Sequence, residues 1–152
     1  MGEVVTVDRE FEVEARRISA EEWSVHWPQI SRQLDTIPQY WSVYWTKEYI
    51  NHAVMNDEWQ AWGFGDMGNI NVVVLTQVIM YPANAILQMV LAFGNSLDLV
   101  TPIIEATFER FAFEAGCKYC EIYGRPGWEV KFPRFKRVGV VLRCEVPAIG
   151  VH

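Results

Sequence analysis

Three cysteines are the first candidates for chemistry, because two of them have the spacing of a redox or metal motif. Cys117-Lys-Tyr-Cys120 is a CxxC pair, and Cys144 stands apart from it. Such a pair can be a dithiol redox centre or half of a zinc site, but a structural zinc site needs four ligands. No second pair follows, and the three histidines are scattered. We therefore expect no metal, and we expect reduced thiols that are buried as small hydrophobic groups.

Basic residues gather near the end of an otherwise acidic chain. The 13 Lys and Arg against 19 Asp and Glu give a formal net charge of −6. Sequence-independent nucleic-acid binding depends on the neutralisation of phosphates, so we expect no nucleic-acid partner. A local basic site remains open, because six cations lie in the last thirty or so residues: Arg125, Lys131, Arg134, Lys136, Arg137 and Arg143.

Aromatic residues are abundant, at 14% of the chain, and they crowd its first half. Most of them are expected to pack in the core or between elements. The segment from Tyr40 to Tyr49 is the exception to consider, since Trp and Tyr are enriched in ligand grooves and partner surfaces. Trp41 and Trp45 in this segment are expected to form an exposed patch.

Length and composition indicate one globular domain that spans residues 1–152, with 51% hydrophobic and 21% charged residues. The longest nearly apolar run, Ile86–Phe93, is much shorter than the about 20 residues that cross a bilayer. No basic segment followed by an apolar one opens the chain as an export signal would. We therefore expect a cytoplasmic protein without a membrane partner.

The first half predicts one strand and two helices. Apolar and charged residues alternate over Glu10–Arg16, as in a half-buried strand. Ser19 and Glu22 then match a capping box. The apolar spacing predicts a helix over Ala20–Leu34, and a second helix over Thr46–Asn56.

The second half predicts an antiparallel meander followed by alternating strands and helices. Turn residues separate β-branched runs, and the apolar period then becomes helical after Gly94. The expected strands are Glu58–Gly65, Val72–Tyr81, Ala85–Phe93, Lys118–Tyr123 and Val138–Val146, with a long helix from Leu97 to near Gly116 and a short helix or loop over Gly124–Phe132. The result is an α+β (α/β) fold with a mixed six- to seven-stranded sheet and about four helices.

From Thr46 to Val146 the chain resembles a GNAT-like acyl-CoA N-acyltransferase subgroup that is common among phage-encoded proteins. The element order is that of the GNAT fold. The most specific motifs are Glu121-Ile-Tyr-Gly-Arg125-Pro-Gly-Trp128-Glu and the closing segment Phe135-Lys-Arg-Val-Gly-Val-Val-Leu-Arg143-Cys-Glu145.

The resemblance implies a site for acetyl-CoA between two strands that part from each other, those ending at Phe93 and at Tyr123. The pantetheine arm would pair with the backbone of Leu91, Ala92 and Phe93. The pyrophosphate would bind the loop Gly94-Asn95-Ser96-Leu97 at the helix N-terminus, where free N–H groups and the helix dipole favour anions. Glycine at position 94 would let the backbone approach the ligand.

The usual family pattern is incomplete in this chain. The phosphate loop has one glycine and no leading basic residue, and Asp98 adds a negative charge there. Val130 stands where many family enzymes place a catalytic Tyr, and the strand before the loop carries Gln88 rather than a carboxylate base. Tyr123 is the substitute candidate to protonate the thiolate, and Arg125 could contact phosphate.

Two functions follow as alternatives. The first is an acetyl-CoA-dependent N-acetyltransferase acting on an amine of a protein or small molecule. The second is a catalytically degenerate GNAT-fold phage protein that acts as an interaction module on a host enzyme or as a virion component. The chain could also form a homodimer. A nucleic-acid binder is a third reading that the net charge opposes.

Overall fold

The computed structural model describes residues 3–8, 11–65, 70–95, 97–124 and 127–148. Its elements follow in this order: β1 (Glu3–Asp8), β2 (Phe11–Arg17), α1 (Ala20–Thr36), the 3₁₀ helix η1 (Gln39–Val43), α2 (Lys47–Met55), β3 (Trp59–Gly65), β4 (Val72–Met80), β5 (Ala85–Gly94), α3 (Leu97–Glu114), β6 (Tyr119–Ile122) and α4 (Trp128–Lys131).

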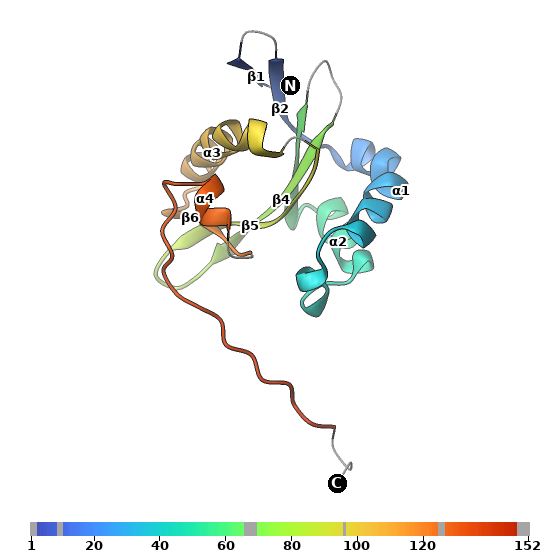
Figure 1. Cartoon of the computed structure of the whole chain (residues 1–152), viewed down its shortest axis with the longest axis vertical. Helices are drawn as coiled ribbons and strands as arrows, with labels where there is room; N and C mark the ends of the chain where they lie inside the picture. Colours follow the sequence, from blue (N-terminus) through green and yellow to red (C-terminus); the bar gives the residue numbers. More distant parts are fainter. Residues whose placement is uncertain (1–2, 9–10, 66–69, 96, 125–126, 149–152) are drawn as a thin grey trace.

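The strands form one mixed sheet in the order β1-β2-β3-β4-β5-β6. Neighbours from β1 to β5 are antiparallel, and β6 runs parallel to β5 because α3 carries the chain back across the sheet. Helices α1 and α2 cover one face, and α3 covers the other (Figure 1). The predicted α+β arrangement of a mixed sheet with four helices is confirmed.

Each face of the sheet has its own hydrophobic core, because successive strand residues point to opposite faces. Trp23, Ile50 and Leu75 lie in the core beneath α1 and α2. Phe64 and Ile104 lie in the core beneath α3. The two cores hold the sheet between helical layers. Packing on both faces therefore determines the shape of a site at the edge of the sheet.

The two helices of the first half begin at side-chain caps. The Ser19 hydroxyl accepts a hydrogen bond from the backbone N–H of Glu22, as the capping motif predicted. The Thr46 hydroxyl accepts one from the N–H of Tyr49. Between the two helices, η1 packs Trp41 into the core at 4% exposure. The Thr46 cap therefore lies at the end of the connection that carries the aromatic segment against the sheet.

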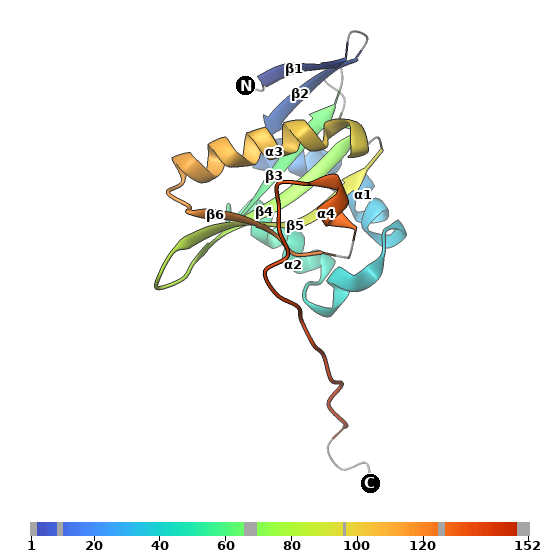
Figure 2. The same cartoon turned by 60° about the vertical axis from the view of Figure 1, so that its left-hand side comes forward.

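The predicted set of strands is wrong at both ends of the chain. Strand β1 pairs with β2, although the sequence analysis placed no strand there. In the described part of the chain, residues 138–146 form no strand despite their β-branched pattern. They run away from the sheet in an extended tail (Figures 1 and 2), with Val138 88% and Leu142 91% exposed. Side-chain alternation indicates strand propensity, but a strand also needs a neighbour for its backbone hydrogen bonds.

Removal of residues 138–152 should change the free energy of unfolding by less than about 0.5 kcal/mol, because the tail side chains bury little surface. Chemical denaturation with urea measures this change. Ile104→Val, in the core beneath α3, is the control and should cost about 1 kcal/mol. A truncation that costs more than this control would show that the tail packs against the domain.

Candidate active site

Strand β6 pairs with β5 over its whole length, Tyr119–Ile122, but β5 extends beyond the end of β6. The parallel register runs from Ile86 opposite Tyr119 to Met89 opposite Ile122. The N–H of Tyr123 makes a last bond to the Met89 carbonyl, at 3.3 Å. Strand β5 continues to Gly94 with no further pairing to β6 among the described residues. The free edge that the prediction requires is therefore present on β5 after Met89, but it arises where β6 ends rather than from two longer strands that separate.

A β-bulge lies where the pairing stops. Leu75 on β4 pairs with Leu91 and Thr76 pairs with Met89, so Val90 is an extra residue on β5. Met89 packs beneath α3, whereas Val90 and Leu91 both pack on the α1–α2 side. A bulge bends its own strand and increases its twist, and this one lies directly after Met89, the last residue of β5 that pairs with β6.

Beyond the end of β6, main-chain groups of β5 are available to a ligand. Leu91, Ala92 and Phe93 remain paired with β4, and in an antiparallel pair alternate residues bond to the neighbour while the others face away. The groups that face away point to the side that β6 has left. An extended ligand could add there as another strand, in the manner of β-augmentation.

Gly94 ends β5 in a conformation that a side chain would strain. Its φ is +133°, and a Cβ at this position would lie 2.1 Å from the backbone oxygen of Asn71. The next residue, Asn95, donates its N–H to that same oxygen at 2.9 Å. The structure thus gives a reason for this glycine that the sequence analysis missed, namely the close approach of the chain to β4. Ser96 lies outside the described residues, and Leu97 begins α3.

The negative charge at the start of α3 has a cationic partner. Lys131 of α4 donates to the carboxylate of Asp98, with which it forms an ion pair. Asp98 lies in the first turn of α3, so Lys131 brings a cation to the helix N-terminus. The sequence analysis found no basic residue leading the loop, and no local motif could have identified one that lies 33 positions further on.

A cavity of about 190 Å³ lies where β5 and β6 separate. Its lining comes from η1 and the segment after it, from β5 and from the end of β6: Tyr40, Trp41, Tyr44, Trp45, Gln88, Val90 and Tyr123. The expectation that aromatics between Tyr40 and Tyr49 line a groove agrees with this. The expected exposed patch is wrong, since Trp41 is buried and Trp45 packs edge-on against Trp59 at 4.9 Å between ring centroids.

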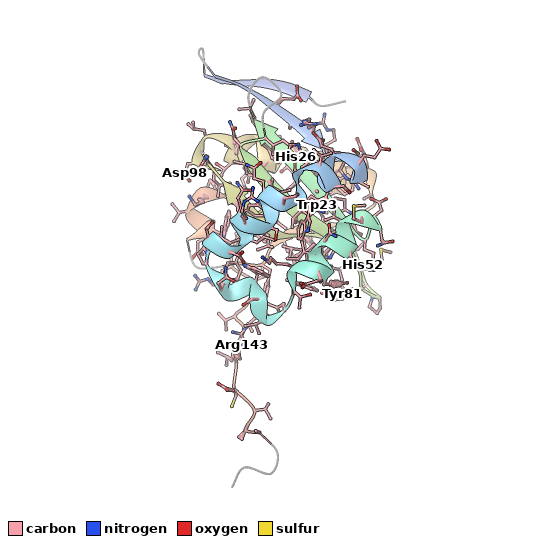
Figure 3. The ribbon with its side chains drawn as sticks, turned by 90° about the vertical axis from the view of Figure 1, so that its right-hand side faces the viewer. Trp23, His26, His52, Tyr81, Asp98 and Arg143 are labelled. Atoms are coloured by element: carbon pink, nitrogen blue, oxygen red, sulfur yellow. The ribbon has the colours of Figure 1, made fainter. Side chains whose placement is uncertain are left out.

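Two tyrosine hydroxyls meet at this cavity. The oxygens of Tyr44 and Tyr123 are 2.8 Å apart, and their rings meet edge to face. Arg143, on the tail, donates to the Tyr44 hydroxyl at 2.6 Å, and its guanidinium lies 5.4 Å from the Tyr44 ring centroid. Figure 3 shows Arg143 where the tail leaves the domain, on the side of η1 and α2. Sequence analysis chose Tyr123 but missed Tyr44, which is 79 positions away.

The shared hydrogen bond shifts the pKa values of the two phenols in opposite directions. The hydrogen bond shared with Tyr123, together with the hydrogen bond and charge of Arg143, lowers the pKa of Tyr44. The same hydroxyl bond raises the pKa of Tyr123. Tyr123 therefore keeps its proton over a wide pH range, as a proton donor must.

The remaining candidates are placed away from this cavity or outside the description. Cys117 and Cys120 are half-buried beside the core beneath α3, and burial raises the pKa of Cys120 to about 11. Within the described ranges, no cluster of His, Cys, Asp and Glu could hold a metal ion. Arg125 is not among the described residues. None of the described helices has the length and apolarity to span a bilayer.

The arrangement of elements is that of GNAT-family acetyltransferases. A GNAT family acetyltransferase from Staphylococcus aureus superposes with a TM-score of 0.60 at 8% identity, covering 88% of this chain and 98% of that one. A predicted acetyltransferase with acetyl-CoA from Clostridium acetobutylicum gives 0.61 at 12% identity, over 88% and 96%. An aminoglycoside acetyltransferase from an uncultured soil metagenomic sample, in complex with sisomicin, gives 0.63 at 11% identity, over 89% and 97%.

These similarities are structural rather than sequential. No protein-family model matches the chain, and no curated protein matches it. At 8–12% identity the three structures define the fold alone. The assignment of activity must therefore come from the site of this chain.

Tyr123→Phe should raise the pKa of Tyr44, because it removes the hydrogen bond that lowers this pKa most. Arg143→Gln should raise it as well, because it removes a positive charge from beside the phenol. NMR titration of protein with ¹³C-labelled tyrosine measures both shifts. Tyr81→Phe, in the β4–β5 turn, is the matched control and should leave Tyr44 unchanged. A Tyr44 pKa that is the same in all four proteins would contradict the hydroxyl contact.

Proposed function

We propose that the protein is an acyl-CoA-dependent N-acyltransferase that transfers an acetyl group from acetyl-CoA to an amine of a small molecule or protein. The observation that carries this proposal is the end of β5–β6 pairing at Met89, beside a cavity that contains Tyr123. An open strand edge can bind an extended donor, and a phenol next to it can protonate the leaving thiolate.

The donor would bind along β5 and across the start of α3. The backbone of Leu91, Ala92 and Phe93 would pair with the pantetheine arm. The loop Gly94-Asn95-Ser96-Leu97 would direct the diphosphate to the free N–H groups of the first turn of α3, an 18-residue helix. Lys131 supplies a cation near this turn, and Arg125 is assigned to the phosphates on its chemistry alone.

The reaction needs one proton to leave the amine and one to reach the sulfur. The amine nitrogen attacks the thioester carbonyl, the C–N bond forms and the C–S bond breaks. Tyr123 donates the proton to the departing thiolate, since its raised pKa keeps the phenol protonated. Backbone N–H groups at the bulge would stabilise the charge on the carbonyl oxygen.

Calorimetric titration with acetyl-CoA tests the donor site. We expect saturable binding with a dissociation constant below about 1 mM, in the range of ordinary enzyme substrates. Tyr123→Phe should leave this constant unchanged and lower the rate of acetyl transfer about 100-fold, the loss expected for a general acid. An absence of heat at millimolar acetyl-CoA would overturn the proposal.

Charges at the start of α3 should set the affinity for the diphosphate. Asp98→Asn removes a negative charge from the first turn and should tighten CoA binding about threefold, whereas Lys131→Gln should weaken it by a similar factor. Dephosphorylated pantetheine, which lacks the diphosphate, is the control ligand and should bind all three proteins equally. Weaker CoA binding by Asp98→Asn together with tighter binding by Lys131→Gln, or no change in either variant, would place the diphosphate elsewhere.

The alternative is a degenerate GNAT-fold protein of the phage-encoded subgroup that binds a host protein in the cytoplasm. The exposed apolar tail favours it, because Val138, Val140 and Leu142 lie at alternate positions of an unpaired extended segment. Such a segment can add to the sheet edge of a partner. Capture from host lysate by the full chain, lost on truncation at residue 137, together with no acetyl-CoA binding, would favour this alternative.

A further inference from the structure

The cavity at the parting of β5 and β6 has the character of a small aromatic box. Tyr40, Trp41, Tyr44 and Trp45 form one wall, and Val90 lies on the other. At about 190 Å³ it is smaller than the pockets of about 300 to 1,000 Å³ that hold drug-sized ligands. A group of the size of one amino-acid side chain is therefore the appropriate occupant.

The charges around the cavity select against a polycation. None of the seven described residues that line it is acidic. A positive charge lies beside it, because the guanidinium of Arg143 reaches the Tyr44 hydroxyl at 2.6 Å. An acceptor with several ammonium groups would find no carboxylate among these lining residues and would lie next to a cation. Aromatic faces, in contrast, favour an apolar or aromatic group and can hold a single ammonium.

The hydroxyl pair offers a path for the proton of such an amine. Tyr44 belongs to the segment after η1, and Tyr123 ends the β6 side of the open slot. Their oxygens are 2.8 Å apart, which is a hydrogen-bond distance, and both residues line the cavity. Arg143 donates to Tyr44 and therefore holds its oxygen in place.

Two hydroxyls in series can replace the carboxylate base that this chain lacks on β5. The Tyr44 oxygen takes a proton from the attacking amine while its own proton passes to the Tyr123 oxygen. The Tyr123 proton passes to the sulfur as the C–S bond breaks. The amine loses one proton, the thiolate gains one, and both tyrosines end neutral, so no other acid or base is consumed.

We propose that the cavity is the acceptor site for a primary amine carried on a small apolar or aromatic group, and that Tyr44 and Tyr123 relay its proton to the leaving thiolate. The inference rests on the proposed acyl-CoA-dependent activity. It adds to that activity a class of acceptor and a second catalytic residue, Tyr44, whose hydroxyl meets the amine. The role of Arg143 is to position Tyr44.

Steady-state kinetics with two acceptors test the acceptor class. The probes are 2-phenylethylamine and the polyamine spermidine, with acetyl-CoA as donor and product CoA measured by chromatography. We expect kcat/KM for 2-phenylethylamine to exceed that for spermidine by at least about tenfold, the ratio that one small apolar group can supply in a pocket. Equal values, a preference for spermidine, or no acetylation of either amine would overturn the acceptor class.

Three variants test the relay. Tyr44→Phe and Tyr123→Phe should each lower kcat about 100-fold, and the double variant should lose no more than either one, because the two hydroxyls act as one unit. Tyr81→Phe is the control and should keep full activity. The stoichiometry of acetyl-CoA binding by calorimetry should stay constant throughout, which a general loss of folding would not allow. Full activity in Tyr44→Phe, or losses that multiply in the double variant, would overturn the relay.

Calorimetry and turnover together distinguish a failure of this inference from a failure of the proposed acyltransferase activity. Calorimetry on each variant reports acetyl-CoA binding without any acceptor. Binding of acetyl-CoA by wild-type protein with unchanged turnover in Tyr44→Phe would remove the relay and leave the acyltransferase standing. No binding of acetyl-CoA to any of the proteins would remove both.

Discussion

The single extra residue at Val90 is the constraint on which the site depends. It lets Val90 and Leu91 fill the core beneath α1 and α2, and it reverses the alternation of β5 beyond that point. It lies directly after Met89, where β6 ends and β5 continues alone. The slot, the cavity and Tyr123 all lie at this point of the sheet, where a bulge bends and twists the strand whose edge is open.

Much of the fold could be predicted from the sequence, since its signals are local. The β-branched run in Val72–Met80 and the helical spacing after Leu97 are each signals that neighbouring residues supply. The strand predicted for the tail is wrong, and the reason is not local. Residues 138–146 have the pattern of a strand, but the free edge of β6 does not bond to them. The sequence of the segment alone does not indicate whether such a partner strand is available.

The site could be predicted only in part, for the same reason. The backbone of Leu91–Phe93 could be chosen because it comes with the strand, and Tyr123 because it ends the next one. Tyr44 and Lys131 could not, since each reaches its partner through tertiary packing across 79 and 33 positions respectively. Their roles depend on where η1 and α4 lie against the sheet. The proposal therefore gives the roles that the family pattern left open to residues that are close in space but distant in sequence.

Residue-resolved amide hydrogen exchange of the full chain, with and without acetyl-CoA, tests the open slot most directly. The account predicts that the amides of Leu91–Phe93 that face away from β4 exchange quickly in the free protein and become protected when acetyl-CoA is added. The amides of Leu87–Met89, already paired, should change little. Slow exchange at every amide of Leu91–Phe93 in the free protein, or no added protection with saturating acetyl-CoA, would contradict it.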